Sequence, residues 1–386
     1  MIMNTLFLGI VIFLIILAVF DLVVGVSNDA VNFLNSAIGA KVAKFRTIVT
    51  VAAVGVFAGA ALSNGMMDVA RHGILTPEYY SFFEVMCIFL SVMVTDVILL
   101  NVFNTLGMPT STTVSMVFEL LGGAFAVAIL KLVHGATTAD GTVLGLGDLL
   151  NTEKAISVIM GIFLSVAIAF VVGMVVMWIS RMVFTFTYRV NGKSTAYNGE
   201  MGGLTSSSLK IGIFSGIAVT SIIWFLLING LKGSNFMTPE VKEIINAYTW
   251  YIIGGCMLVF SVIMTIASAF KLPVLKFVVL LGTFALAMAF AGNDLVNFIG
   301  VPLTGLEAYQ DYAANGSGAP DGYMMTSLME SAHTPTIFLV AAGVVMVLSL
   351  VFSKKAQNVV KTSVDLSRQD EGDEMFGSSP VARSLV

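Results

Sequence analysis

Long runs of hydrophobic residues, separated by short polar segments, divide the chain. They lie near residues 5–26, 45–64, 82–106, 110–133, 155–181, 209–230, 247–270, 274–299 and 334–352. A run of about 20 residues is long enough to cross a bilayer as a helix. The runs are continuous in Leu, Val, Ile, Phe and Ala, whereas the strands of a membrane barrel alternate apolar and polar residues. The pattern predicts an all-α integral membrane protein, a polytopic helical bundle of about nine spans.

Composition supports this class. Hydrophobic residues make up 57% of the chain and charged residues 11%, and the mean hydropathy is +0.95. These values are far from those of a soluble domain, so the partner we expect is the lipid bilayer and not a nucleic acid. No basic residue precedes the first run, which also contains Asp21, so we expect it to be retained and not cleaved as a signal peptide.

The distribution of Lys and Arg predicts an orientation, because positive residues are retained on the cytoplasmic side of a membrane. With the N-terminus outside, the inner loops and the tail hold fourteen of the 19 Lys and Arg residues. We therefore expect a multi-pass protein of the cell membrane, the inner or cytoplasmic membrane in bacteria, with its N-terminus outside.

Polar segments suggest a division into two halves. Residues 1–190 form a first transmembrane half, 191–208 a flexible cytoplasmic linker, and 209–352 a second, incomplete half. Residues 353–386 read as a polar cytoplasmic tail, disordered by composition. The polar segment 303–333 contains no Lys or Arg and is predicted to be an external loop.

One motif occurs twice. The sequence SNDAVNF spans Ser27 to Phe33, and GNDLVNF spans Gly292 to Phe298. An acidic residue inside a membrane costs about 3 kcal/mol on insertion scales, so it is a functional hypothesis by default. In the predicted orientation the two copies run in opposite directions across the membrane. Inverted-topology repeats with binding residues at broken or re-entrant helices are typical of secondary transporters.

The motif offers oxygen ligands. On a helix, Asn28, Asp29 and Asn32 project from one side, as do Asn293, Asp294 and Asn297. Carboxylate and amide oxygens suit a hard cation such as sodium, whereas zinc and copper favour His or Cys, which neither copy contains. The alternative is a polar contact that joins two helices by hydrogen bonds. The recurrence favours a cation site, with sodium as coupling ion and no other cofactor.

A second motif, PTSTT, spans Pro109 to Thr113 and precedes an apolar run. Pro109 suits the first turn of a helix, where the hydroxyls of the motif would lie beside free backbone N–H groups. Such a helix start can bind an oxyanion without Lys or Arg. An N-capping cluster is the structural alternative.

Together the motifs imply coupling. A carboxylate 4 Å from a phosphate charge repels it by about 4 kcal/mol at an effective dielectric constant near 20. Sodium held by Asp29 and Asp294 would cancel that repulsion, so anion affinity would depend on cation occupancy.

Other features are less specific. Asp21, Asp96 and Glu119 lie within apolar runs and form a candidate for a further ion or proton site. The patterns GVFAG, Gly55 to Gly59, and GIFSG, Gly212 to Gly216, permit close helix packing and give weak support for dimer contacts.

These motifs resemble the inorganic phosphate transporter (PiT) family, whose duplicated signature reads GANDVAN or close to it and whose hairpin carries P-x-S-T-T. The resemblance covers nearly the whole chain up to the tail. It implies sodium- or proton-coupled symport of inorganic phosphate by alternating access, and a homodimer. By position, Asp29, Asn32, Asp294 and Asn297 would hold sodium, and Thr110, Ser111, Thr112 and Thr113 would hold phosphate, with Asn28 and Asn293 near both.

The sequence departs from that family in one respect that bears on function. A second P-x-S-T-T is missing before Val386, so we expect a longer natural chain whose last spans follow it. Two alternatives remain. The chain could carry sulfate or another oxyanion, or be a non-transporting truncated or sensory membrane subunit. An enzyme is not indicated, because we find no nucleophile with its base and no metal set such as H-E-x-x-H.

Overall fold

Helices make up the architecture. The computed structural model describes residues 2–63, 71, 73–137, 143–185, 206–227, 238–316, 318–330 and 334–366. The helices are α1 (Ile2–Gly39), α2 (Phe45–Leu62), α3 (Phe82–Leu106), α4 (Thr112–Val133), α5 (Leu146–Leu149), α6 (Thr152–Thr185), α7 (Ser206–Phe225), α8 (Pro239–Ala269), α9 (Val274–Asn315), α10 (Thr336–Phe352) and α11 (Lys354–Leu366). Short 3-10 turns at Pro77–Tyr79, Pro320–Gly322 and Thr326–Met329 lie in the connections.

The predicted membrane spans are confirmed. Within the described ranges, eight helices are long and apolar enough to cross a membrane, and α10 with α11 makes a ninth if that bent pair counts as one span. Each predicted run falls on one of these helices. The fold is therefore that of a polytopic helical membrane protein.

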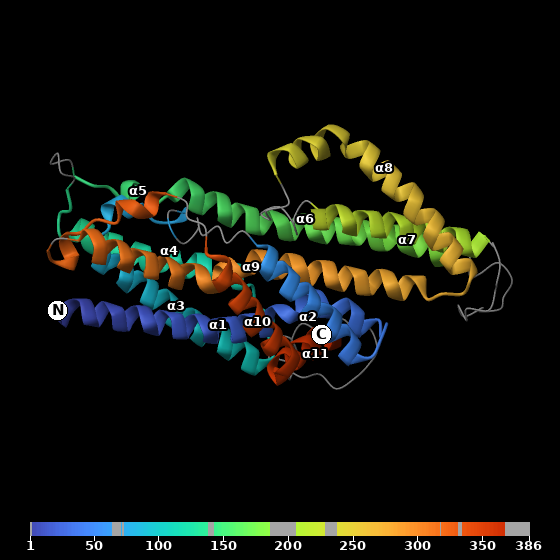
Figure 1. Cartoon of the computed structure of the whole chain (residues 1–386), viewed down its shortest axis with the longest axis horizontal. Coiled ribbons are helices and arrows are strands. Elements are labelled where there is room, and N and C mark those ends of the chain that lie inside the picture. The colour runs from blue at the N-terminus through green and yellow to red at the C-terminus, as the bar shows by residue number, and fades with distance from the viewer. Residues whose placement is uncertain are drawn as a thin grey trace, which may run out of the picture.

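Helices α1 and α9 form the centre of the bundle and run antiparallel to each other (Figure 1). Phe7 packs against Tyr312 with ring centroids 6.4 Å apart, and Phe33 packs against Phe290 at 6.2 Å. Each step forward along α1 is thus matched by a step back along α9. This register sets Asp29 and Asp294 at the same level, and it fits the opposite directions predicted for the two motif copies.

Both central helices continue through their motifs. The predicted spans 5–26 and 274–299 end near the motifs, whereas α1 extends to Gly39 and α9 to Asn315. The helix breaks expected at the motifs are therefore absent. A broken helix does occur elsewhere, because α10 and α11 meet at an angle of 65° around Ser353.

The two small-residue patterns mediate packing within the chain. A Cβ atom added at Gly59 would lie 2.0 Å from the backbone oxygen of Met288, so α2 touches the backbone of α9 there. A Cβ atom at Gly216 would lie 2.5 Å from the Cα atom of Ser261, which joins α7 to α8 in the same way. Packing within one chain therefore accounts for both patterns, and neither is evidence for a dimer.

The buried core consists of two large clusters along α1. The first half of α1, including Phe7 and Leu14, packs with α3, α4 and the end of α9. The second half, including Val26 and Phe33, packs with α2, α9, α10 and α11. A smaller cluster joins α7, α8 and the start of α9. The motifs lie in the second cluster, so their polar groups are surrounded by apolar side chains.

Two predicted polar segments differ in the structure. The predicted external loop 303–333 is wrong over its first part, because α9 continues to Asn315 and buries Thr304 and Ala308. The predicted disordered tail is wrong for Lys354–Leu366, which form α11. Its apolar positions share one face and are buried, with Val359 fully enclosed against the bundle. Most of the predicted linker and residues 367–386 lie outside the described residues.

Candidate functional site

The PTSTT segment forms the connection between α3 and α4. Helix α3 ends at Leu106 and is capped by Gly107, whose φ of +69° is the left-handed conformation that glycine adopts readily. Ser111 caps α4, and its hydroxyl accepts a hydrogen bond from the Val114 N–H at 3.3 Å. The prediction that Pro109 lies in the first helical turn is therefore wrong, since the helix begins three residues later at Thr112.

Asn28 fixes this connection to α1. Its amide nitrogen donates to Asn104 Oδ1 at 2.7 Å and to the Met108 carbonyl at 3.1 Å. Its amide oxygen accepts a hydrogen bond from the Thr110 N–H at 2.8 Å. Asn28 is fully buried, and both of its amide hydrogens are used within the protein. In this conformation it holds the segment in place and has no N–H left for a phosphate oxygen.

The two acids of the duplicated motif meet the hydroxyls of PTSTT. Thr112 Oγ1 donates to the Asp29 carboxylate, 3.2 Å from Oδ2, and Thr113 Oγ1 lies 3.4 Å from Asp294 Oδ1. Asn297 donates from its amide nitrogen to Thr113 Oγ1 at 2.9 Å. Helices α1, α4 and α9 thus bring Asp29, Thr112, Thr113, Asp294 and Asn297 together, and we call these five residues the paired-acid site.

The two acids of the paired-acid site are largely shielded from solvent, whereas Thr113 is exposed. Asp29 is 4% exposed and Asp294 is 8% exposed, and the two carboxylates are close enough to interact electrostatically. Two like charges in such surroundings destabilise each other and lose hydration. The arrangement therefore favours a cation between or beside the acids.

Other predicted ligands lie at the margin. Asn32, Asn293 and Ser111 are exposed, and Thr110 is half-buried with its backbone N–H held by Asn28. The structure thus brings five of the predicted site residues together in the paired-acid site and leaves these others outside it.

The further predicted acids also come together. Ser115 Oγ lies 2.7 Å from Asp96 Oδ1 and 2.9 Å from Glu119 Oε1. Asp21 on α1 is fully buried beside Asp96, and neither of its carboxylate oxygens has a hydrogen-bond partner. We call Asp21, Asp96, Ser115 and Glu119 the acid cluster.

Sequence reasoning missed several polar residues near the motifs. Asn104 is fully buried and also donates to the Val24 carbonyl at 2.6 Å. Ser27 donates to Ser353 Oγ at 2.8 Å, and so ties the motif to the bend between α10 and α11. Asn104 could have been suspected, since it is an amide in an apolar run only five residues before Pro109. Nothing in the sequence pattern indicates the contact between Ser27 and Ser353.

The donor set fits sodium. The paired-acid site offers two carboxylates and two hydroxyls, all hard oxygen ligands, and the Asn297 amide nitrogen donates to Asp294 Oδ1. Among the residues that the structure describes, no group of three or more His, Cys, Asp or Glu is arranged to hold a metal ion. The paired-acid site itself contains two carboxylates, Asp29 and Asp294, with neutral hydroxyl oxygens beside them. Such a set suits a cation of low charge, such as sodium.

Comparison with known proteins decides the family. A model of the phosphate transporter family matches residues 25–362, a range that includes both Asn-Asp motifs and PTSTT. The chain belongs to the phosphate transporter family. Membership in the phosphate transporter family agrees with the resemblance inferred from the motifs, and it makes the protein a multi-pass membrane transporter. A search of curated proteins gave no match.

A solved structure shares the fold of this phosphate transporter family member. It is described as the sodium-dependent phosphate transporter, and it superposes with a TM-score of 0.62 at 17% sequence identity. The match covers 92% of this chain and 78% of the other. At this identity the likeness establishes the helical architecture and not the ligands.

Proposed function

We propose that the protein is a sodium-coupled symporter of inorganic phosphate that works by alternating access. The observation that carries the proposal is the contact of the Thr112 and Thr113 hydroxyls with the two acids Asp29 and Asp294. These contacts join PTSTT, a segment suited to an oxyanion, to a pair of carboxylates suited to cations. Family membership supports phosphate as substrate. The name of the solved structure with this fold adds sodium as the expected ion.

The proposed roles follow from the contacts. Asp29 and Asp294 would hold sodium, with Asn297 and Asn32 as further oxygen ligands. The Thr112 and Thr113 hydroxyls, Ser111, Thr110 and the open N–H groups at the start of α4 would face phosphate. Asn293 lies beside this region, and Asn28 would position Thr110 rather than bind phosphate itself.

Coupling arises from electrostatics. Without sodium, each carboxylate would repel phosphate by about 4 kcal/mol at 4 Å and an effective dielectric constant near 20. That corresponds to almost a thousandfold in affinity. Sodium bound to the acids removes the repulsion, so each ligand strengthens the binding of the other. We extend the proposal to a homodimer in the cell membrane with the N-terminus outside.

Phosphate uptake into proteoliposomes tests the proposal. We expect uptake to follow an imposed sodium gradient, and replacement of both acids, Asp29→Asn with Asp294→Asn, to lower sodium-dependent uptake at least about a hundredfold because two charge contacts are lost. Asp321→Asn is the matched control, because Asp321 is an exposed acid in the turn after α9.

Two outcomes would change the proposal. Sodium-dependent uptake that survives in the double variant removes the cation role of the acids. Sulfate that competes with phosphate at equal concentration makes the protein a carrier of oxyanions in general, since hydroxyl and N–H donors accept either anion.

A further inference from the structure

The acid cluster has too few hydrogens for its contacts. Ser115 Oγ is at hydrogen-bond distance from two carboxyl groups, 2.7 Å from Asp96 Oδ1 and 2.9 Å from Glu119 Oε1. A hydroxyl carries one hydrogen, so it can donate to only one of them. The other contact is a hydrogen bond only if that carboxyl group carries a proton and donates to Ser115.

Asp21 gives independent evidence for a bound proton. It is 0% exposed, and both of its oxygens lack a donor. Of the acids that act on Asp21 electrostatically, Asp96, a second carboxyl group, acts most strongly. Two ionised carboxylates would repel each other there, whereas one proton between them forms a hydrogen bond and removes a charge.

The charged groups around Asp21 give no other means of neutralisation. The acids that interact with it are Asp96 on α3, Glu119 on α4 and Asp29 on α1 itself. In the described part of the chain, the acid cluster forms no ion pair with a lysine or arginine. Helix α11 carries Lys354, Lys355 and Lys361, and its Lys355 donates to Asn101 on α3.

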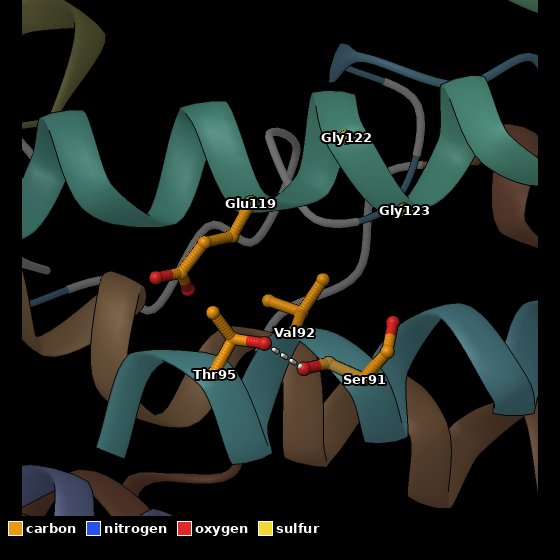
Figure 2. A pocket seen from close by; sticks show the side chains of 6 residues that line it. All are labelled: Ser91, Val92, Thr95, Glu119, Gly122 and Gly123. Carbon is orange, nitrogen blue, oxygen red and sulfur yellow. Dashed lines mark hydrogen bonds between the residues drawn. The ribbon is translucent and has the colours of Figure 1, made fainter. Parts of the chain in front are cut away.

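A pocket leads to the cluster. Ser91, Val92 and Thr95 of α3 and Glu119, Gly122 and Gly123 of α4 surround a cavity of about 230 Å³ (Figure 2). The Glu119 carboxylate reaches across toward α3 in this view. Its Oε1 lies 2.9 Å from Ser115 Oγ. The cavity is large enough for several water molecules, and Glu119 lines it and also contacts Ser115.

We propose that Asp21, Asp96 and Glu119 form a proton-binding site, distinct from the paired-acid site, which exchanges protons with the pocket between α3 and α4 through Glu119 and Ser115. A proton taken up by Glu119 is passed on when Ser115 donates its own hydrogen to Asp96 and accepts the one from Glu119, so no charge is left on the serine. A proton and not a metal ion is the expected occupant, because one of the two Ser115 contacts already requires a protonated carboxyl group.

Infrared spectroscopy of the reconstituted protein tests the site without any transport. We expect absorption of protonated carboxyl groups at neutral pH in saturating sodium, and we expect Asp21→Asn and Glu119→Gln each to reduce it. Glu84→Gln is the control, because Glu84 on α3 lies outside the acid cluster and forms an ion pair with Lys131 at 2.7 Å. Equal absorption in the unchanged protein and in a triple variant with Asp96→Asn added would overturn the proposal.

The consequence for uptake rests on the proposed function. Sodium-driven phosphate uptake should fall as the pH rises and the acid cluster loses its protons, and Asp21→Asn should remove that part of the response. Glu84→Gln should keep it, together with any response that is due to phosphate itself. If no protein takes up phosphate but the infrared difference is present, the proposed function fails and the proton site stands. If uptake depends on pH equally in Asp21→Asn and Glu84→Gln, the link between the cluster and transport is disproved.

Discussion

At the scale of single residues, adjacent positions of one motif have separate tasks. Asn28 uses its amide to hold Asn104, Met108 and Thr110, so it builds the turn before α4. Asp29, one position later, contacts Thr112 and interacts with Asp294. A motif that reads as one ligand group in sequence thus divides into a positioning residue and a proposed ion ligand.

Asn28→Ala is expected to lower the thermal stability of the purified protein in sodium-free detergent solution. The change takes the partner away from the buried Asn104 Oδ1 and from the Thr110 N–H, which costs about 1–3 kcal/mol. Asn32→Ala, four residues later on the same helix and exposed, should change stability by less than about 0.5 kcal/mol. Equal losses in the two variants would show that Asn28 has no special structural role.

The sequence alone identifies the acids but not their amide partners. Asp29 and Asp294 are conspicuous because a carboxylate in an apolar run is costly and the motif is repeated. The bond between Asn28 and Asn104 joins residues 76 positions apart. It depends on how α1 and α3 pack, and no periodicity in the sequence encodes that.

At the scale of elements, hydrophobic runs predict where helices lie but not where they end. The run that ends near residue 26 and the helix that ends at Gly39 differ because the polar residues of the motif pair with other helices and not with solvent. Helix α11 was missed for a related reason. It is short and polar by composition, and only its docking against α1 and α3 buries Val359 and Thr362.

Gly59→Ala is expected to weaken the packing of α2 on α9. The added methyl group would meet the backbone of Met288 at 2.0 Å, where no flexible side chain can give way, and overpacking of this kind costs about 1–3 kcal/mol. The thermal midpoint of unfolding should fall. In Gly161→Ala the new methyl group meets nothing within 4 Å, so stability should stay equal or rise by up to about 1 kcal/mol. A fall in both variants would contradict the close contact.

At the scale of the whole molecule, the antiparallel pair α1 and α9 organises everything else. Helices α3 and α4 bring PTSTT against it from one direction, and α2 and α10 pack on its other parts. The connections after α4 and after α9 gather at one end of the bundle (Figure 1). The sequence predicted opposite directions for the two motifs from charge bias, and the contacts agree for these two helices. The repeat of the complete halves stays a prediction.

Chemical labelling checks the predicted orientation. In a background with Cys87→Ser and Cys256→Ser, an impermeant maleimide should label Asp321→Cys in intact cells and label Lys44→Cys only after permeabilisation. Lys44 is exposed in the connection after α1, and Asp321 is exposed in the connection after α9. Because α1 and α9 are antiparallel, these connections follow opposite ends of the pair. The physical reason is the retention of Lys and Arg on the cytoplasmic side. The reverse pattern of labelling would place the N-terminus inside.

The register between α1 and α9 has a consequence for motion. Gly25 now lies against Phe298, and Phe33 against Phe290. If α9 slid by four residues, about one helical turn of 5.4 Å, Asp29 would come opposite Phe298 and Asp294 opposite Phe33. Both acids would then exchange a charged neighbour for an aromatic ring in the same movement. In the proposed symporter, a sodium ion shared by the acids would therefore stabilise the present register of α1 and α9. Its release would allow the two helices to slide.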